Sequence, residues 1–289
     1  MKNNRLTAQE WGGRILFALL FAVMAASILI VFTPWGSPPP KLGWVNDYLA
    51  KIGVSIVLLG AALLARRSER FNKYWQVLFS LFILTAAISL DWVFGNYVIH
   101  SMGIEQSTTS GWAFIKLSEC LVVASVIITF TLASGNKLGS IYLQKGNLKL
   151  GLTIGLICFF IFAAASIPMA NLFNANNLSV DRIMPWIPWL LIFVFANATM
   201  EELLFRGLFL RKLEPFLGKF MSNFLVAFIF VGIHSWVTYT ADNRIFLAVT
   251  FPLALALGYI MQKTDSVWGS ILLHAGMDIP VMLGIFSNL

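Results

Sequence analysis

The sequence has little charge and almost no cysteine. Only 11% of its 289 residues are charged and 58% are hydrophobic, whereas an ordinary soluble domain has about 25% charged residues. A soluble domain of this length could not cover its surface with so few charges. The two cysteines, Cys120 and Cys158, both fall inside apolar stretches and therefore say nothing of a disulfide. These shortages exclude a soluble globular protein and indicate an integral membrane protein.

Long apolar runs take the place of the missing charges. A run close to 20 residues long can cross roughly 30 Å of hydrocarbon as a helix. The predicted spans are 15–33, 48–65, 75–99, 112–133, 150–169, 186–210, 219–240, 245–262 and 266–287. The expected fold is therefore all-α, a polytopic membrane bundle of about nine helices. We expect a boundary near residue 148, between accessory helices in 1–148 and the remaining helices in 149–289.

The net charge of +7 is distributed unevenly along the chain. Basic residues in short loops mark the cytoplasmic side of a membrane protein. With a cytoplasmic N-terminus, the inner segments hold Lys2, Arg5, Arg14, Arg66, Arg67, Arg70, Lys73, Lys137, Lys145, Lys149, Arg211, Lys212, Lys219 and Lys263. The outer segments hold only Lys41, Arg182 and Arg244. This bias predicts an inner N-terminus, an outer C-terminus and an odd number of spans. In a bacterium the membrane would be the cell membrane, and no nucleic-acid partner is expected.

The first apolar run could also be a signal peptide, because basic residues precede it. At 15–33 it is longer than a typical signal core, and a proline-rich turn follows it. A retained first helix is the favoured interpretation.

A few ionisable residues fall inside the N-terminal spans. Asp47 and Lys51 are four residues apart, and Lys116 and Glu119 are three apart, so each pair can meet on one helix face. We expect structural ion pairs there. Asp91 has no obvious local partner.

Ionisable residues are more concentrated in the C-terminal spans. They are Glu201, Glu202 and Arg206 in 186–210, His234 in 219–240, and His274 and Asp278 in 266–287. An unpaired ionisable group near the bilayer centre costs a few kcal/mol. A single ionisable residue of this kind would usually form an interhelical hydrogen bond. Six ionisable residues on three helices must converge on one another or on a water-filled cavity, and this convergence favours an active site.

These residues match three motifs in order: E-E-x-x-x-R, F-x-x-x-H from Phe230 to His234, and H-x-x-x-N/D. Over roughly residues 186–285 the chain resembles the CAAX-protease and bacteriocin-processing family of intramembrane proteases, which includes the type II CAAX prenyl endopeptidases. The resemblance implies a membrane-embedded peptidase core, so 149–289 is expected to be an intramembrane protease domain with its motifs in 186–285. The best-known members remove the residues that follow a prenylated cysteine.

Other intramembrane protease classes fit less well. The sequence has no H-E-x-x-H for a zinc site on one helix and no G-x-S-x-G serine elbow. The serine-type and aspartate-type intramembrane motifs are missing as well.

Helical spacing separates the two glutamates. Glu202 and Arg206 are four apart and would pair on one face, whereas Glu201 lies about 100° away and is left free. Glu201 is therefore the expected general base that activates a water, and the resemblance gives the first glutamate the same role. His234 would share that water or carry its proton to the leaving amine.

The role of Asp278 stays open. In the family's metal-free mechanism His274 and the residue at this position, commonly Asn, stabilise the oxyanion. An ionised aspartate cannot donate a hydrogen bond. Asp278 is therefore protonated, or orients His274, or helps bind a metal. Glu201, His234, His274 and Asp278 could hold a catalytic Zn²⁺, whereas the glutamate-type mechanism needs no cofactor.

The helical rise per residue predicts different membrane depths for Glu201 and His234. Glu201 lies roughly 15 Å from Arg211 at the inner face, whereas His234 lies about 22 Å from Lys219. The two align only if the seventh span begins inside the cytoplasm or tilts. Access from the lipid would suit a cleavage point near the inner leaflet.

The expected function is an intramembrane endopeptidase that hydrolyses membrane-bound or lipidated, CAAX-like protein substrates. Its partners would be the lipid bilayer and a membrane-associated protein or peptide. One alternative is a proton-coupled transporter, since carboxylates and histidines also form proton relays, although no internal repeat is visible. The other is a non-catalytic membrane scaffold or immunity-type protein.

Overall fold

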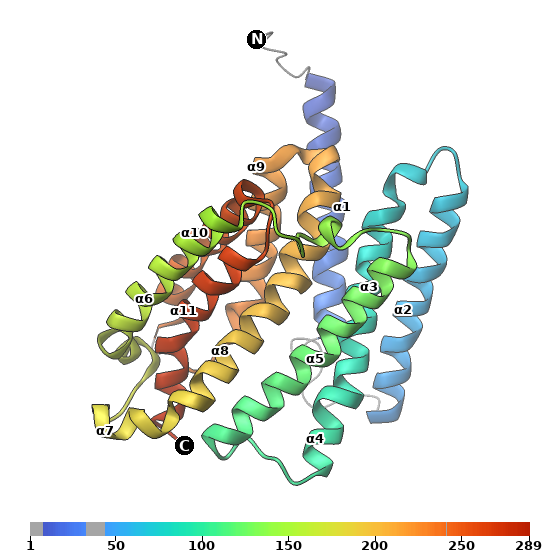
Figure 1. The fold of residues 1–289 in the computed structure, drawn as a ribbon. Helices are drawn as coiled ribbons and strands as arrows, with labels where there is room; N and C mark the ends of the chain where they lie inside the picture. The colour runs from blue at the N-terminus through green and yellow to red at the C-terminus, as the bar shows by residue number, and fades with distance from the viewer. Residues whose placement is uncertain (1–7, 33–43, 241) are drawn as a thin grey trace.

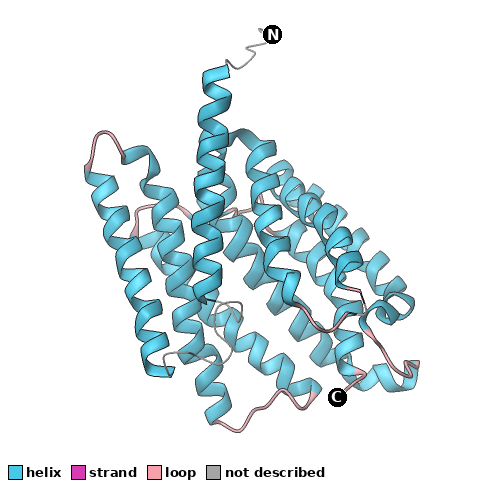
Figure 2. Cartoon of the chain, turned by 180° about the vertical axis from the view of Figure 1, so that it is seen from behind, coloured by secondary structure: helices cyan, strands magenta, loops and turns pink. Residues whose placement is uncertain are grey.

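The computed structural model describes residues 8–32, 44–240 and 242–289, and every regular element in these ranges is a helix (Figures 1 and 2). The predicted all-helical membrane fold is confirmed. Lys2, Arg5 and Lys41, which entered the charge count, lie outside the described residues.

The helices follow one another with short connections. The first part contains α1 (Ala8–Phe32), α2 (Trp44–Arg67), η1 (Asn72–Tyr74), α3 (Trp75–Leu90), the π-helix η2 (Asp91–Tyr97), α4 (Val98–Ser101), α5 (Thr109–Ala133) and η3 (Leu138–Ile141). The second part contains α6 (Leu148–Ala170), η4 (Asn171–Phe173), α7 (Val180–Ile183), η5 (Met184–Trp186), α8 (Ile187–Glu201), the π-helix η6 (Glu202–Gly207), α9 (Leu208–Ile233), η7 (His234–Trp236), α10 (Asn243–Thr264) and α11 (Trp268–Phe286).

Eight helical stretches of the described chain are long and apolar enough to cross a membrane. One of them, Val180–Ile233, is 54 residues long. It breaks at Gly218, whose φ of 77° and ψ of 169° are not helical, and Figure 1 shows the chain turning back there. Glycine adopts this conformation without a Cβ clash. The two arms and the seven other stretches together agree with the prediction of about nine crossings.

Two predicted helix ends are wrong. The sixth span was expected to end near residue 210, but the helix continues to Leu217, and the seventh ends at Ile233 rather than at residue 240. The basic pair after residue 210 suggested a cytoplasmic end. Lys212, however, is buried and donates to the carbonyl oxygen of Ser140 at 2.9 Å, so it does not mark a helix end.

The longer helix removes the conflict of depth. Sixteen residues separate Glu201 from Leu217, which is about 24 Å of helix. Fifteen residues separate Lys219 from His234 on the returning arm, which is about 22 Å. The turn at Gly218 therefore places Glu201 and His234 at similar depth.

Close glycine contacts join α11 to α6. A Cβ added at Gly269 would lie 2.7 Å from the backbone oxygen of Gly151, and one at Gly276 would lie 2.8 Å from the Cα of Phe159. Small residues let helix backbones approach closely in membranes. This contact fixes the position of α11, which carries the third motif.

Helices of the first part pack directly on the second. On α5, the Trp112 ring lies 6.0 Å from the Phe193 ring of α8, measured between centroids. On α1, Arg14 donates to the carbonyl oxygen of Leu217 at 3.2 Å. The division at residue 148 stays a prediction.

The two expected ion pairs of the first part are present. Asp47 and Lys51 lie 2.8 Å apart, and Lys116 and Glu119 lie 2.5 Å apart, measured between charged atoms. Both pairs lie within a single helix, as their spacing predicted.

The basic residues gather at one end of the bundle, which we call the basic end. In Figure 1 it is the upper end, where α1 begins, α2 ends and the α9 turn lies. Twelve of the fourteen residues predicted to be inner are described: Arg14, Arg66, Arg67, Arg70, Lys73, Lys137, Lys145, Lys149, Arg211, Lys212, Lys219 and Lys263. Helix α11 ends at the opposite end (Figure 1). The cytoplasmic location of the basic end stays a prediction.

Orientation can be tested with single cysteines at the two ends. Glu69→Cys lies after α2 at the basic end, and Asn288→Cys lies after α11 at the other. We expect a membrane-impermeant thiol reagent to label Asn288→Cys in intact cells and Glu69→Cys only after the membrane is opened. Labelling of both from the same side would refute an odd number of crossings.

Candidate active site

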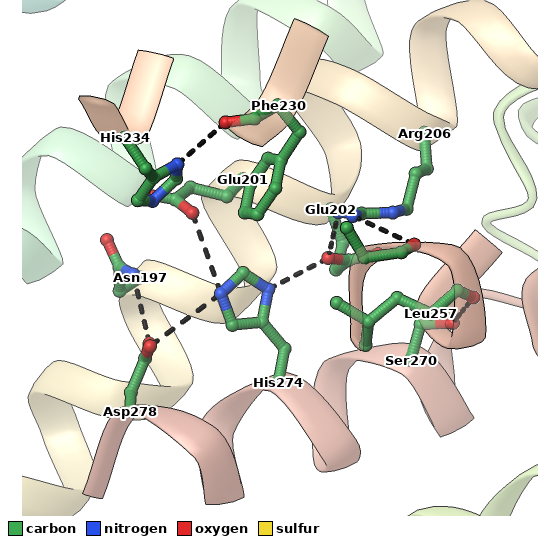
Figure 3. A network of polar contacts seen from close by, with 11 residues as sticks. Asn197, Glu201, Glu202, Arg206, Phe230, His234, Leu257, Ser270, His274 and Asp278 are labelled. Carbon is green, nitrogen blue, oxygen red and sulfur yellow. Dashed lines mark hydrogen bonds and ion pairs between the residues drawn. The ribbon is translucent and has the colours of Figure 1, made fainter. Parts of the chain in front are cut away.

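A cavity of about 250 Å³ lies among the C-terminal helices and α5. Glu201, His234, His274 and Asp278 all line it, so the structure brings together side chains that are up to 77 positions apart in sequence. Glu202 and Arg206 do not line it, and they lie on the other side of the His274 ring from Glu201 and Asp278 (Figure 3).

Glu202 and Arg206 form an ion pair with both side chains 0% exposed. Arg206 Nη1 donates to Glu202 Oε1 at 2.6 Å, and Nη2 donates to the carbonyl oxygen of Ala254 on α10 at 3.2 Å. The guanidinium carbon also lies 4.4 Å from the centroid of the Phe230 ring. A buried ion pair is tolerated only when hydrogen bonds of this kind satisfy it.

A change of helix type separates the two glutamates. Helix α8 ends at Glu201 and the π-helix η6 begins at Glu202, with the Leu208 N–H donating five residues back to Leu203. Such π turns are rare and frequently lie at functional sites. Here Glu201 reaches the cavity while Glu202 stays fully buried.

Glu202 also orients His274. His274 Nδ1 lies 2.8 Å from Glu202 Oε1, the same oxygen that accepts from Arg206 (Figure 3). Because that oxygen belongs to a carboxylate paired with arginine, Nδ1 carries the hydrogen and donates it. The ring therefore turns Nε2 toward the cavity. Glu202 therefore holds the Nδ1 side of the ring, whereas Asp278 faces Nε2.

Two carboxyl groups face His274 Nε2. Glu201 Oε2 lies 3.5 Å from it and Asp278 Oδ1 lies 3.7 Å from it. Two carboxylates and a lone pair in such proximity would repel one another. At least one proton is therefore held among these three groups.

Asn197 is a site residue that the sequence analysis missed. It lies one helical turn before Glu201 and its Nδ2 donates to Asp278 Oδ2 at 3.0 Å. It also lines the cavity. The available signal was an amide in an apolar run, four residues before the first glutamate of the motif.

His234 is fixed through its own helix. The structure places Nδ1 2.8 Å from the carbonyl oxygen of Phe230, which can only accept. Nδ1 therefore carries the hydrogen, and Nε2 is left with a lone pair. His234 begins the short turn η7, just after α9 ends at Ile233.

Tyr239 and Trp112 line the cavity as well, and neither belongs to a motif. Tyr239 lies in the connection between η7 and α10. Burial, helped by the negative charges of Asp278 and Glu201, raises the pKa of Tyr239, so its phenol stays protonated. The cavity therefore holds an O–H donor near the two carboxyl groups.

The possible zinc ligands do not form a metal site. In the described ranges, no three His, Cys, Asp or Glu side chains are grouped so as to hold a metal ion. The Nδ1 hydrogen bonds of His274 and His234 leave both Nε2 atoms free. The grouping of the described side chains does not support the ligand set of Glu201, His234, His274 and Asp278, and we derive no step through a metal.

Comparison with protein families agrees with the motifs. Residues 183–280 match the model of the Rce1-like family, described as type II CAAX prenyl endopeptidase Rce1-like. The resemblance to the CAAX proteases is confirmed. The Rce1-like segment contains all three motifs and supports a CAAX-type intramembrane protease at the family level. Comparison with curated proteins and with solved structures finds no match.

The position of Glu202 predicts a structural effect. Glu202→Gln removes the charge that Arg206 and His274 share, and breaking a buried pair costs about 3–5 kcal/mol. We expect a clearly lower unfolding temperature in detergent and poor expression. Glu201→Gln, beside it in sequence, is the matched control and should unfold close to the wild type. Equal unfolding temperatures for Glu202→Gln and wild type would show that the pair does not hold the segment together.

Proposed function

We propose that this protein is an intramembrane endopeptidase that hydrolyses peptide bonds of membrane-bound or lipidated, CAAX-like protein substrates. The family match supports a protease. One observation supports the assignment of the base. The Glu201 side chain lines the cavity and is 16% exposed, whereas Glu202 is 0% exposed and paired with Arg206. A carboxylate that is partly exposed at the cavity wall is available to a water.

The charge balance of the site favours a protonated His274. With Glu201, Glu202 and Asp278 ionised and Arg206 positive, a neutral imidazole leaves a net charge of about −2 in a buried site, and an imidazolium reduces it to about −1. We therefore place the shared proton on His274 Nε2. An N–H then points into the cavity between the two carboxylates.

The proposed reaction begins with a water held between Glu201 and the substrate. Glu201 accepts a proton from the water, and the oxygen of that water attacks the scissile carbonyl carbon. The negative charge that forms on the carbonyl oxygen is stabilised by the His274 Nε2–H. When the C–N bond breaks, the proton passes from Glu201 to the leaving amine, directly or through His234. No covalent enzyme intermediate is needed.

Asp278 has a supporting role in this scheme. The amide of Asn197 holds one of its oxygens, and the other faces His274 Nε2. The aspartate favours the imidazolium, so it promotes oxyanion stabilisation without donating a hydrogen bond itself. Tyr239 supplies a further O–H donor in the same cavity.

Glu201→Gln tests the base. The amide keeps the shape of the side chain but cannot accept a proton from water, so we expect proteolysis to be lost while the protein stays folded. The measurement compares new N-terminal peptides in membrane fractions of cells that express the wild type or the variant. Glu105→Gln, in an exposed loop, is the control and should behave like the wild type. Unchanged cleavage by Glu201→Gln would favour the scaffold interpretation.

A chelator tests the alternative mechanism. We expect purified wild-type protein to contain no stoichiometric zinc and to retain cleavage in 1,10-phenanthroline, because the described His, Asp and Glu side chains form no metal-holding group. Metal content by mass spectrometry gives a readout that does not depend on activity. Activity that is lost with the chelator and restored by zinc would refute the glutamate-type mechanism.

A further inference from the structure

The cavity extends from the catalytic cluster in one direction only, away from the basic end. On α11, the lining residues His274, Asp278, Val281 and Ile285 follow one face toward the end of the helix. Asp278 lies eight residues before Phe286, where α11 ends, which corresponds to about 12 Å. The residues that line the cavity therefore extend from His274 to the end of the bundle opposite the basic end.

Aromatic side chains line the cavity at that opposite end. Phe173 follows the end of α6, Tyr239 precedes α10, and Phe246 lies in the first turn of α10. Their ring centroids lie 6.0–6.3 Å apart. The Thr240 hydroxyl donates to the carbonyl oxygen of Leu172 at 3.2 Å and ties the connection to this rim. Irregular backbone at membrane depth is tolerated where it lines a water-filled cavity.

The basic end is closed by the segment between α5 and α6. Ile141 is 0% exposed and Tyr142 is 2% exposed, although both lie in a connection between helices. The Val267 N–H donates to the carbonyl oxygen of Tyr142 at 3.0 Å, and the Arg211 guanidinium lies 4.2 Å from the centroid of the Tyr142 ring. The Ile141 carbonyl oxygen lies against Gly207, which follows Arg206 in η6.

A second layer lies between this segment and the cavity. Glu202 and Arg206 are 0% exposed, whereas the side chains of Glu201 and Asp278 are 16% exposed. Exposure of the polar groups therefore increases from the basic end toward the cavity. Water reaches Glu201 through the cavity and not through the basic end.

We propose that the active site opens on the non-cytoplasmic side and receives an extracytoplasmic peptide segment of a membrane-bound protein. The proposal combines the direction of the cavity with the cytoplasmic location of the basic end. The peptide substrate in this proposal rests on the proposed function, whereas the side on which the cavity opens does not. Among the substrates proposed above, the opening therefore selects membrane-bound segments on the non-cytoplasmic side. A cleavage point near the inner leaflet, as the sequence suggested, and a prenylated tail at the cytoplasmic surface both lie on the closed side.

The lining also defines the chemistry of the segment. The cavity wall is mostly aromatic and aliphatic, and none of the described residues that line it is Lys or Arg. An acidic substrate side chain would lie against Glu201 and Asp278, and the His274 imidazolium already faces both of these carboxylates. The site therefore fits an extended segment with apolar or aromatic side chains and no Asp or Glu beside the scissile bond.

Thiol accessibility tests the opening on the full-length protein. In a Cys120→Ala, Cys158→Ala background, Val281→Cys and Ile285→Cys place single thiols in the cavity, one and two turns beyond Asp278. Ile161→Cys, on the exposed apolar face of α6, is the lipid-facing control, and Glu69→Cys reports the basic end. Intact cells and inverted vesicles are treated with the small cationic reagent 2-(trimethylammonium)ethyl methanethiosulfonate. Unreacted thiols are then counted by a maleimide gel shift.

We expect both cavity thiols to react at least tenfold faster in intact cells than in inverted vesicles, with Glu69→Cys showing the reverse and Ile161→Cys reacting in neither. Cavity thiols that react from the same side as Glu69→Cys would overturn the proposal. Absence of reaction from both sides, in two variants whose thiols react after denaturation, would overturn it equally.

The N-terminal peptides that depend on Glu201 give a second readout. Cleavage sites in extracytoplasmic segments support the proposal, and sites in cytoplasmic segments overturn it while leaving the protease function intact. If no peptide depends on Glu201, the protease function fails, and the thiol accessibility still decides where the cavity opens.

Discussion

The buried carboxylate of Glu202 is the constraint on which the site depends. One oxygen accepts from Arg206 at 2.6 Å and lies 2.8 Å from His274 Nδ1, in a place with no exposure. An isolated carboxylate there would be strongly unfavourable, so the two donors and the π turn have to be kept together. Arg206 links this carboxylate to α10 and His274 links it to α11. The orientation of His274 is therefore fixed by the same interaction that makes the buried charge tolerable.

Sequence periodicity predicted what lies within one helix. The pairs Asp47–Lys51, Lys116–Glu119 and Glu202–Arg206 follow from spacings of three and four residues, and all of them form. Interhelical contacts of His274 could not be obtained in this way. Its contact with Glu202 joins α11 to the first residue of the π-helix η6, and no spacing along one helix predicts a contact between two helices.

The depth of His234 shows a related limit. Basic residues usually mark helix ends in a membrane protein, and Lys212 broke this rule because the carbonyl oxygen of Ser140, far away in sequence, accepts its ammonium group inside the protein. The chain turns at Gly218 instead, so the basic pair after residue 210 did not mark the end of the helix. The sequence analysis did not place Trp112 and Tyr239 in the site, because neither residue belongs to a motif and only the packing of the helices brings them to the cavity.

Hydrolysis inside a membrane needs water at the scissile bond, yet a continuous polar path across the bilayer would let ions leak. The structure separates these demands along the bundle axis. The polar groups that need water line the cavity, and the Glu202–Arg206 pair behind them is 0% exposed and is held by hydrogen bonds within the protein. The buried segment at Ile141 and Tyr142 closes the basic end behind that pair. One-sided access is therefore what allows this arrangement of charges to coexist with an intact permeability barrier.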